Sequence, residues 1–190
     1  LFKMNPIYTI MNPIKIPLGR IDKSINKAFI EDCKKHPNQD SSCKDGYVKA
    51  CFNPKFMTHQ NLHTVQEIQK KYIEPYLLNS LIDLYTDSFS NRIIVEKYKK
   101  NIEIQSMWLV EFDHKTHFKL HTHMSLPNMY SFSWYLKCEG NRTVVFMSDN
   151  KEYEISVSEG DLLFFPGWLP HRAEGANSIC CSGNLKIEVE

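Results

Sequence analysis

Two patterns of apolar residues divide the chain. Between residues 24 and 36, the sequence SINKAFIEDCKKH spaces its apolar residues at helical intervals, with Ser24 at the N-cap position. A second helical pattern covers residues 64–84, and Pro75 is expected to kink or split that helix. A loop rich in Asn, Asp, Ser and Gly separates the two patterns. We therefore expect region 1–101 to consist largely of helices and loops that support the rest of the chain.

After about residue 102, the apolar and polar residues alternate with the period of a β-strand. The alternating segments are separated by short turns that contain Gly, Asn, Asp or Pro, and no helical pattern lies between them. Strands in such quick succession indicate antiparallel pairing, so we predict a mainly β protein whose region 102–190 forms a double-sheet jelly roll. The expected strands cover residues 102–112, 117–123, 129–137, 143–148, 153–158, 161–166 and 178–190.

The composition indicates a single globular domain over residues 1–190. The chain has a mass of 22.3 kDa, with 42% hydrophobic and 24% charged residues. A formal net charge of +1 provides no electrostatic attraction for nucleic acid or for an anionic membrane. No segment approaches the roughly 20 apolar residues of a membrane span. The six cysteines form no CxxC pair, and we expect them to be reduced thiols of a cytoplasmic protein.

Two histidines, His121 and His123, lie one residue apart in the expected strand 117–123. Alternate residues of a strand point to the same side, so the two imidazoles can converge on one metal ion. His171 follows a Pro-Gly turn after the apolar strand 161–166, and it can reach the same site as a third ligand. Neutral imidazole suits iron, zinc, copper or nickel. We predict a metal site formed by these three histidines.

The alternative for these histidines is an ordinary structural role. An HxH pair often arises by chance, and a histidine is commonly an exposed or hydrogen-bonded residue. The pair is more informative here because the pattern G-x5-P-x4-H, over residues 160–171, accompanies it in the same expected jelly roll. Trp168, next to the Pro-Gly turn, is the aromatic residue that we expect to line the substrate entrance.

The histidines also belong to a longer series of motifs. In chain order these are Met107-Trp108, His121-Thr122-His123, Trp134-Tyr135-Leu136 and FPGWLPH, which spans residues 165–171. The series resembles that of the non-haem iron(II), 2-oxoglutarate-dependent oxygenases, in particular a group of small oxygenases from bacteria and their viruses. The resemblance covers about residues 106–190, and FPGWLPH is its most specific part.

Membership of this family implies a double-stranded β-helix that binds Fe(II) through His121, His123 and His171. It implies 2-oxoglutarate as a cosubstrate that chelates the iron, and O2 as the oxidant. The implied reaction converts 2-oxoglutarate to succinate and CO2 while it oxidises a C–H bond of a small-molecule or peptide substrate, as in a hydroxylase. The resemblance leaves the identity of the substrate and the oligomeric state open.

Position 123 departs from the family pattern, in which the ligands are two histidines and one carboxylate. A site with His123 as a ligand has one negative charge fewer. Glu111 and Asp113 precede the motif and Asn128 follows it. We predict that both His121 and His123 bind the metal. The alternative is that only one of them binds and that the third ligand lies elsewhere.

A second departure concerns the basic residue that family members use to bind the distal carboxylate of 2-oxoglutarate. Ser178 stands where the family commonly has an Arg. Lys137 and Arg142, on either side of Gly140, are then the candidates, and the planar guanidinium of Arg is the better geometric match for a carboxylate. The alternative for both residues is a solvated hairpin end.

Three functions follow from these interpretations. The leading one is an Fe(II)- and 2-oxoglutarate-dependent oxygenase. A cupin-type enzyme with three histidine ligands and no 2-oxoglutarate also fits the segment GDLLFFPGWLPH, although no Glu follows His123 at the cupin spacing. A non-catalytic jelly-roll binding module is the third, and in that case replacing the three histidines would change neither metal content nor any ligand response.

Overall fold

The structure is a computed structural model that describes residues 14–17, 23–34, 48–52, 67, 70–72, 75, 102–112, 119–123, 126 and 129–187. Its elements are β1 (Ile14–Pro17), α1 (Lys23–Lys34), β2 (Val48–Phe52), β3 (Ile102–Phe112), β4 (Met129–Cys138), β5 (Arg142–Ser148), β6 (Lys151–Val157), β7 (Asp161–Pro166), β8 (His171–Gly175) and β9 (Ser178–Ile187). None of the described helical segments is long and apolar enough to cross a membrane.

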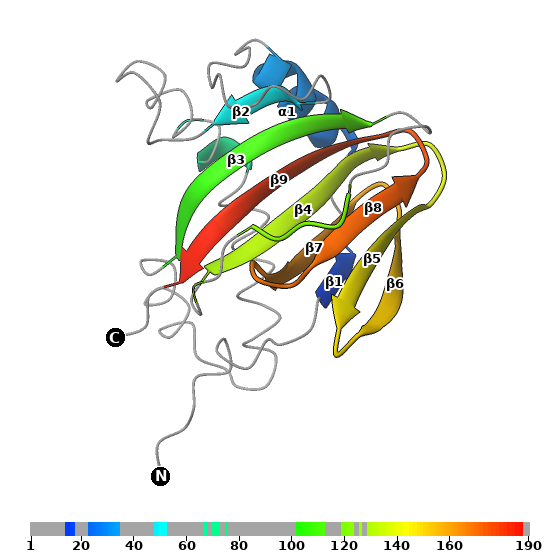
Figure 1. Cartoon of the computed structure of the whole chain (residues 1–190). Coiled ribbons are helices and arrows are strands. Elements are labelled where there is room, and N and C mark those ends of the chain that lie inside the picture. The colour runs from blue at the N-terminus through cyan, green and yellow to red at the C-terminus, as the bar shows by residue number, and fades with distance from the viewer. Residues whose placement is uncertain are drawn as a thin grey trace, which may run out of the picture.

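The strands form two antiparallel sheets that face each other. The larger sheet has six strands in the order β1-β7-β4-β9-β3-β2, and the smaller has three in the order β6-β5-β8. Figure 1 shows the long, curved strands β3, β9 and β4 side by side, with β8, β5 and β6 next to them. This arrangement confirms the prediction of a mainly β protein with a jelly-roll architecture.

Apolar side chains from both sheets fill the space between them. Because burying such side chains is the main favourable contribution to folding, this cluster holds the two sheets together. Its buried members are Val110, Phe112, Tyr135, Val144, Phe146, Val157, Leu163, Phe165, Leu169 and Cys180.

Strand β4 is buried on both faces, which explains its nearly continuous apolar sequence. Ser133 and Tyr135 point toward the smaller sheet, where they line a pocket. Trp134 lies between them in the sequence and therefore points to the opposite face. There its ring contacts that of Phe29 in α1, with 5.7 Å between the centroids, and Phe29 in turn stacks on Tyr72 at 4.7 Å. The helix thus covers the outer face of the larger sheet.

Gly183 in β9 allows a close approach between neighbouring parts of the larger sheet. A Cβ atom at this position would lie 2.6 Å from Cε1 of Phe132 and 2.6 Å from the carbonyl oxygen of Ser106. Real Cβ atoms do not approach other heavy atoms so closely. A side chain at position 183 therefore requires the ring of Phe132 and the backbone of β3 to move.

A two-residue turn joins β5 to β6. Asp149 and Asn150 have φ angles of 51° and 61°, the conformation of a type I′ hairpin turn. Asp and Asn tolerate positive φ better than other non-glycine residues. The turn sets the register in which Ser148 pairs with Lys151.

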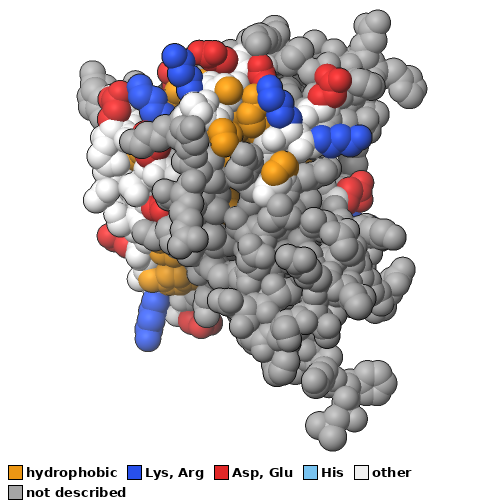
Figure 2. Space-filling model, turned by 180° about the vertical axis from the view of Figure 1, so that it is seen from behind, with side chains coloured by type: hydrophobic (Ala, Val, Ile, Leu, Met, Phe, Trp, Pro, Cys, Tyr) orange, Lys and Arg blue, Asp and Glu red, His pale blue; other side chains and the backbone are white. Residues whose placement is uncertain are grey.

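On the face turned away from the view of Figure 1, Lys and Arg side chains of the described residues are interspersed with Asp and Glu (Figure 2). This mixture of charges agrees with the net charge of +1.

Most of the predicted elements are present. Helix α1 confirms the helix predicted over residues 24–36, and β3, β4 and β7 have their predicted bounds to within one residue. Strand β5 also agrees to within one residue, whereas β6 begins two residues and ends one residue earlier than predicted. Strand β9 begins at the predicted residue, and residues 188–190 lie outside the described part. Most of the helix predicted over 64–84 also lies outside it.

The local sequence pattern does not predict β1 or β2. Both are short strands at the edges of the larger sheet, where β1 pairs with β7 and β2 pairs with β3. Such short strands depend on hydrogen bonds to partners that are distant in the sequence, so their own residues carry little signal.

Candidate metal centre

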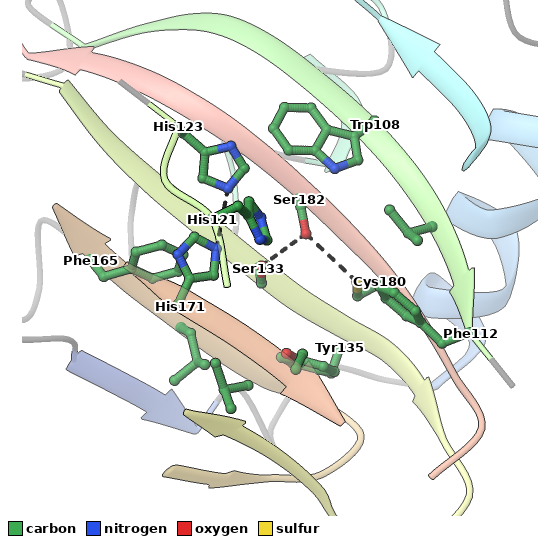
Figure 3. A pocket seen from close by; sticks show the side chains of 14 residues that line it. Trp108, Phe112, His121, His123, Ser133, Tyr135, Phe165, His171, Cys180 and Ser182 are labelled. Atoms are coloured by element: carbon green, nitrogen blue, oxygen red, sulfur yellow. Dashed lines mark hydrogen bonds between the residues drawn. The ribbon is translucent and has the colours of Figure 1, made fainter. Parts of the chain in front are cut away.

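Three histidines converge on one point between the two sheets. His121, His123 and His171 each offer one ring nitrogen, and these nitrogens lie within 4.8 Å of one another. The Nε2 atoms of His123 and His171 are 3.2 Å apart. The ring centroids of His121 and His171 are separated by 4.4 Å, and Figure 3 shows the three rings turned toward one another. The structure therefore brings together the three residues predicted to form the site.

Backbone hydrogen bonds place the first two histidines beside the third. The amide of His121 donates to the carbonyl of His171 and the amide of His171 donates back, both at 3.0 Å. The amide of His123 donates to the carbonyl of Gly167 at 2.9 Å. Only an isolated bridge forms within residues 119–123, where the sequence predicts a regular strand, and residues 117 and 118 lie outside the described part.

The outer nitrogen of two of the rings is held by the backbone. Nδ1 of His171 lies 3.0 Å from the carbonyl oxygen of Leu169, and Nδ1 of His121 lies 2.8 Å from that of Lys119. Because a carbonyl only accepts hydrogen bonds, Nδ1 carries a proton in both rings, and Nε2 is the nitrogen that can offer a lone pair to a metal. Metal-binding histidines are oriented in the same way in known metalloproteins.

The FPGWLPH segment therefore positions two of the three histidines. The carbonyl of Gly167 holds the backbone of His123, and the carbonyl of Leu169 holds the ring of His171. Gly167 and Leu169 belong to the turn that follows the buried strand β7, so the turn fixes where His171 lies relative to that strand.

Burial keeps two of the imidazoles neutral. It lowers the pKa of His123 to about 3, with a smaller effect from the neighbouring rings of His171 and His121. It lowers the pKa of His171 to about 4, although the hydrogen bond to Leu169 opposes this change. At neutral pH both rings have a lone pair for a metal.

Aromatic rings surround the cluster. Phe165 contacts His171 edge to face with 4.6 Å between the centroids, and Phe146 approaches the same ring at 5.9 Å. Trp108 lies beside His123 at 5.4 Å. These rings limit the orientations of both imidazoles and reduce the access of water to them.

A pocket of roughly 490 Å³, including its part open to solvent, extends from the histidines between the sheets. Figure 3 shows Ser133 and Ser182 between the histidines and Tyr135, with Cys180 and Phe112 farther along the same wall. The hydroxyls of Ser133 and Ser182 are 2.8 Å apart, and Cys180 Sγ lies 3.6 Å from Ser182 Oγ. Burial raises the pKa of the Cys180 thiol to about 11, so the thiol is protonated at neutral pH.

Arg142 lies behind this wall and is 0% exposed. Its guanidinium stacks on the ring of Phe112, with 4.1 Å from Cζ to the centroid. Nη1 and Nη2 donate to the carbonyls of Ala176 and Ala173 at 2.9 and 3.3 Å, whereas Nε is buried without a hydrogen-bond partner. No acidic side chain of the described part forms an ion pair with it. Arg142 is thus a buried cation and not part of a solvated hairpin end.

Lys137, the other predicted basic residue, has a different environment. Its side chain is exposed and its Nζ lies 3.2 Å from Oε1 of Glu139. Neither Lys137 nor Arg142 lines the pocket itself, but Arg142 stacks on Phe112, which does. Ser178 is buried but does not line the pocket either, whereas Cys180, two residues farther along β9, does.

Several residues of the pocket are not singled out by the sequence. Ser133 and Tyr135 are alternate residues of β4, Cys180 and Ser182 are alternate residues of β9, and all four line the pocket. This period-two series of polar residues is the signal that could have identified them. Trp108 lines the pocket, whereas Trp168, the expected entrance residue, packs against the apolar core instead.

Of the residues considered as a source of the missing carboxylate, the structure describes only Glu111, and Glu111 is not in the cluster. Trp108, Val110 and Phe112 of β3 line the pocket, so Glu111 points to the opposite face of the strand. Asp113 and Asn128 lie outside the described residues. Among the described residues that line the pocket, none is a carboxylate.

The sequence matches no known family and no curated protein. Solved structures do share the fold. The non-haem alpha-ketoglutarate-dependent carbocyclase SnoK from nogalamycin biosynthesis superposes with a TM-score of 0.61 at 10% identity, covering 96% of this chain and 82% of that one. A 2OG-Fe(II) oxygenase family oxidoreductase from Burkholderia pseudomallei gives 0.60 at 9% identity, with coverages of 92% and 84%.

A third similar structure is the nickel complex of the non-haem monooxygenase ThoJ, with a TM-score of 0.57 at 8% identity and coverages of 95% and 75%. At these identities the likeness establishes the fold. The chain has the double-stranded β-helix found in 2-oxoglutarate oxygenases, as the motif resemblance implies.

Proposed function

We propose that this protein is an Fe(II)- and 2-oxoglutarate-dependent oxygenase, in the simplest case a hydroxylase of a small-molecule or peptide substrate. The observation that carries the proposal is the convergence of His121, His123 and His171 at a pocket. The buried cation Arg142 stacks on Phe112, which lines that pocket. The shared fold supports it, because two of the similar structures are described as enzymes that use alpha-ketoglutarate or belong to the 2OG-Fe(II) oxygenases.

The donor set fits a divalent transition metal. Three imidazoles, two of them with Nδ1 hydrogen-bonded to the backbone, are suitable ligands for Fe(II). When bound there, Fe(II) would supply the activation of O2 that converts 2-oxoglutarate to succinate and CO2 and oxidises the substrate. The backbone hydrogen bonds of the FPGWLPH turn keep His123 and His171 in place during this reaction.

The part of the pocket lined by Tyr135 and Phe112, with Arg142 stacked on Phe112, is the part that fits the distal carboxylate of 2-oxoglutarate. Arg142 has a positive charge and an unpaired Nε, and the hydroxyl of Tyr135 has no hydrogen bond to the described residues. Burial raises the pKa of Tyr135 well above its ordinary value, so the hydroxyl retains its proton and can donate. We assign the carboxylate to these two groups and not to Lys137, because Lys137 is exposed and paired with Glu139.

Other residues of the pocket keep the reactants oriented and dry. Phe112 stacks on the guanidinium of Arg142 and holds its plane. The carbonyls of Ala176 and Ala173 accept hydrogen bonds from Nη1 and Nη2 and fix these two nitrogens. The rings of Phe146 and Phe165 cover His171 on its apolar side. A pocket with apolar walls strengthens the attraction between Arg142 and a carboxylate.

A second candidate is a three-histidine oxygenase that does not use 2-oxoglutarate. The observation that favours it is the absence of a carboxylate among the described residues that line the pocket. In such an enzyme, Arg142 and Tyr135 would bind a carboxylate of the substrate itself. The two candidates differ in whether 2-oxoglutarate is consumed.

The test is an anaerobic loading of the purified protein with Fe(II), followed by 2-oxoglutarate and then O2, with succinate as the product measured. We expect succinate from the wild type and none from His123→Ala. In calorimetric titrations, Arg142→Met is expected to weaken 2-oxoglutarate binding by about tenfold or more, because an ion pair in an apolar site is lost.

Lys137→Ala is the matched control, and its affinity for 2-oxoglutarate should equal that of the wild type. Metal-loaded wild type that neither binds 2-oxoglutarate nor forms succinate would contradict the proposal in favour of the second candidate. A protein whose metal content is unchanged by His123→Ala would contradict both candidates.

A further inference from the structure

Trp108 is the remaining polar group of the pocket without an assigned partner. It lies on the pocket-facing side of β3, with its ring 5.4 Å from that of His123. Figure 3 shows the indole with its nitrogen on the edge that faces Ser182 and the pocket. The indole N–H forms no hydrogen bond with the described residues. Buried or half-buried Trp N–H groups normally have an acceptor, so a ligand is the expected partner.

Besides the mutually hydrogen-bonded hydroxyls of Ser133 and Ser182, the pocket has two further hydrogen-bond donors, Trp108 and Tyr135. Figure 3 shows Trp108 near His123 and Tyr135 at a distance from it, with Ser182 and Ser133 between the two. Tyr135 and Arg142 are already assigned to the distal carboxylate of the cosubstrate. Trp108 is therefore left for the second reactant, the molecule that is oxidised.

The charge of the site restricts what this reactant can be. A divalent metal and the buried Arg142 bring three positive charges, and the two carboxylates of bound 2-oxoglutarate offset two of them. No described pocket-lining residue is a carboxylate that could offset the third. A cationic group brought into this environment meets repulsion, and the described residues that line the pocket offer it no anionic acceptor. A carboxylate or carbonyl oxygen meets attraction and a free N–H.

We infer that the substrate presents a carboxylate or carbonyl oxygen to Nε1 of Trp108, and that molecules which enter with an ammonium group are rejected. This inference rests on the proposed function, since it takes the place of 2-oxoglutarate as given. Trp108 is thus a specificity-determining residue, and the substrate class is an acid or a carbonyl compound.

The test uses protein loaded with Zn(II), which has no redox chemistry, and saturated with 2-oxoglutarate. Benzoate, benzamide and benzylamine are titrated by calorimetry, because they share one ring and differ in the polar group. We expect affinity to fall in the order benzoate, benzamide, benzylamine. Trp108→Phe retains the aromatic ring without the N–H, and it should weaken benzoate binding by about tenfold, the effect of one hydrogen bond to a charged group.

Trp168→Phe is the matched control and should bind benzoate as the wild type does. Benzylamine binding as tightly as benzoate, no binding of benzoate, or an unchanged benzoate affinity in Trp108→Phe would each overturn the inference. The wild-type comparison needs no variant, so a folding defect in Trp108→Phe does not affect it. If 2-oxoglutarate itself fails to bind the Zn(II) protein, the proposed function fails, whereas the order of the three probes still tests the preference of the pocket.

Discussion

His121 and His171 exchange two backbone hydrogen bonds of 3.0 Å, although they are far apart in the sequence, and their rings lie with 4.4 Å between the centroids. The antiparallel bridge aligns the HxH segment with the first residue of β8, so His123 also reaches the cluster through the carbonyl of Gly167. A metal bound by all three rings would therefore join this segment to the smaller sheet.

Metal binding is expected to depend on His171 and not on its exposed neighbours. His171→Ala removes one of three ligands and should weaken Ni(II) or Co(II) binding by at least about 100-fold in calorimetric titrations, because the remaining pair lacks the chelate geometry. Lys119→Ala is the control, since only the backbone carbonyl of Lys119 contacts His121. Equal affinities of the two variants would show that these histidines do not form the metal site.

The stability of the metal-free protein is expected to fall in mild acid. The pKa values of His123 and His171 in the folded state, about 3 and about 4, lie below the ordinary value of 6.5. The unfolded chain therefore takes up protons first as the pH falls. Above pH 6.5 each histidine makes its full contribution to the free energy of unfolding. Between pH 6.5 and about 4, each histidine lowers that free energy by about 1.4 kcal/mol per pH unit.

Urea unfolding at pH 7.5 and pH 5 measures this change. The double variant with His123→Gln and His171→Gln is the control, because it lacks both titrating groups. The wild type should lose more unfolding free energy than the variant over this interval. Equal losses would mean that the two imidazoles are not buried in the neutral form.

Tyr135→Phe is expected to weaken 2-oxoglutarate binding without loosening the fold. The ring of Tyr135 belongs to the core between the sheets and is retained, whereas the hydroxyl has no partner among the described residues. We expect an affinity about tenfold lower by calorimetry and a melting temperature near that of the wild type. A lower affinity that is accompanied by a clearly lower melting temperature would instead assign Tyr135 a structural role.

Gly183→Ala is expected to destabilise the protein by about 2–4 kcal/mol. The new Cβ would lie 2.6 Å from both the ring of Phe132 and the backbone oxygen of Ser106, so β9 must shift within the larger sheet. Lys151→Ala, an exposed change on β6, provides the comparison and should leave the urea midpoint unchanged. A stable Gly183→Ala protein would show that β3 and β9 are farther apart than described.

The local sequence determined much of this protein. Short runs of strand-like apolar residues predict β3, β4 and β7, and helical spacing predicts α1, because each pattern reports the burial of a single element. The two-residue period also places His121 and His123 on one side of their segment, and the Pro-Gly turn before His171 identifies the third ring. These features depend on neighbouring residues, so they are readable without the fold.

The tertiary structure decided the rest. It placed Arg142 in the interior against Phe112 although Arg142 begins a strand beside a hairpin turn, and it left Lys137 in solvent. It also turned Trp108 and Tyr135 toward the histidines and recruited β1 and β2 to the edges of the larger sheet. Strand parity states which residues share a face, but the identity of the buried face depends on pairing between distant segments. That information is not contained in any short stretch of the chain.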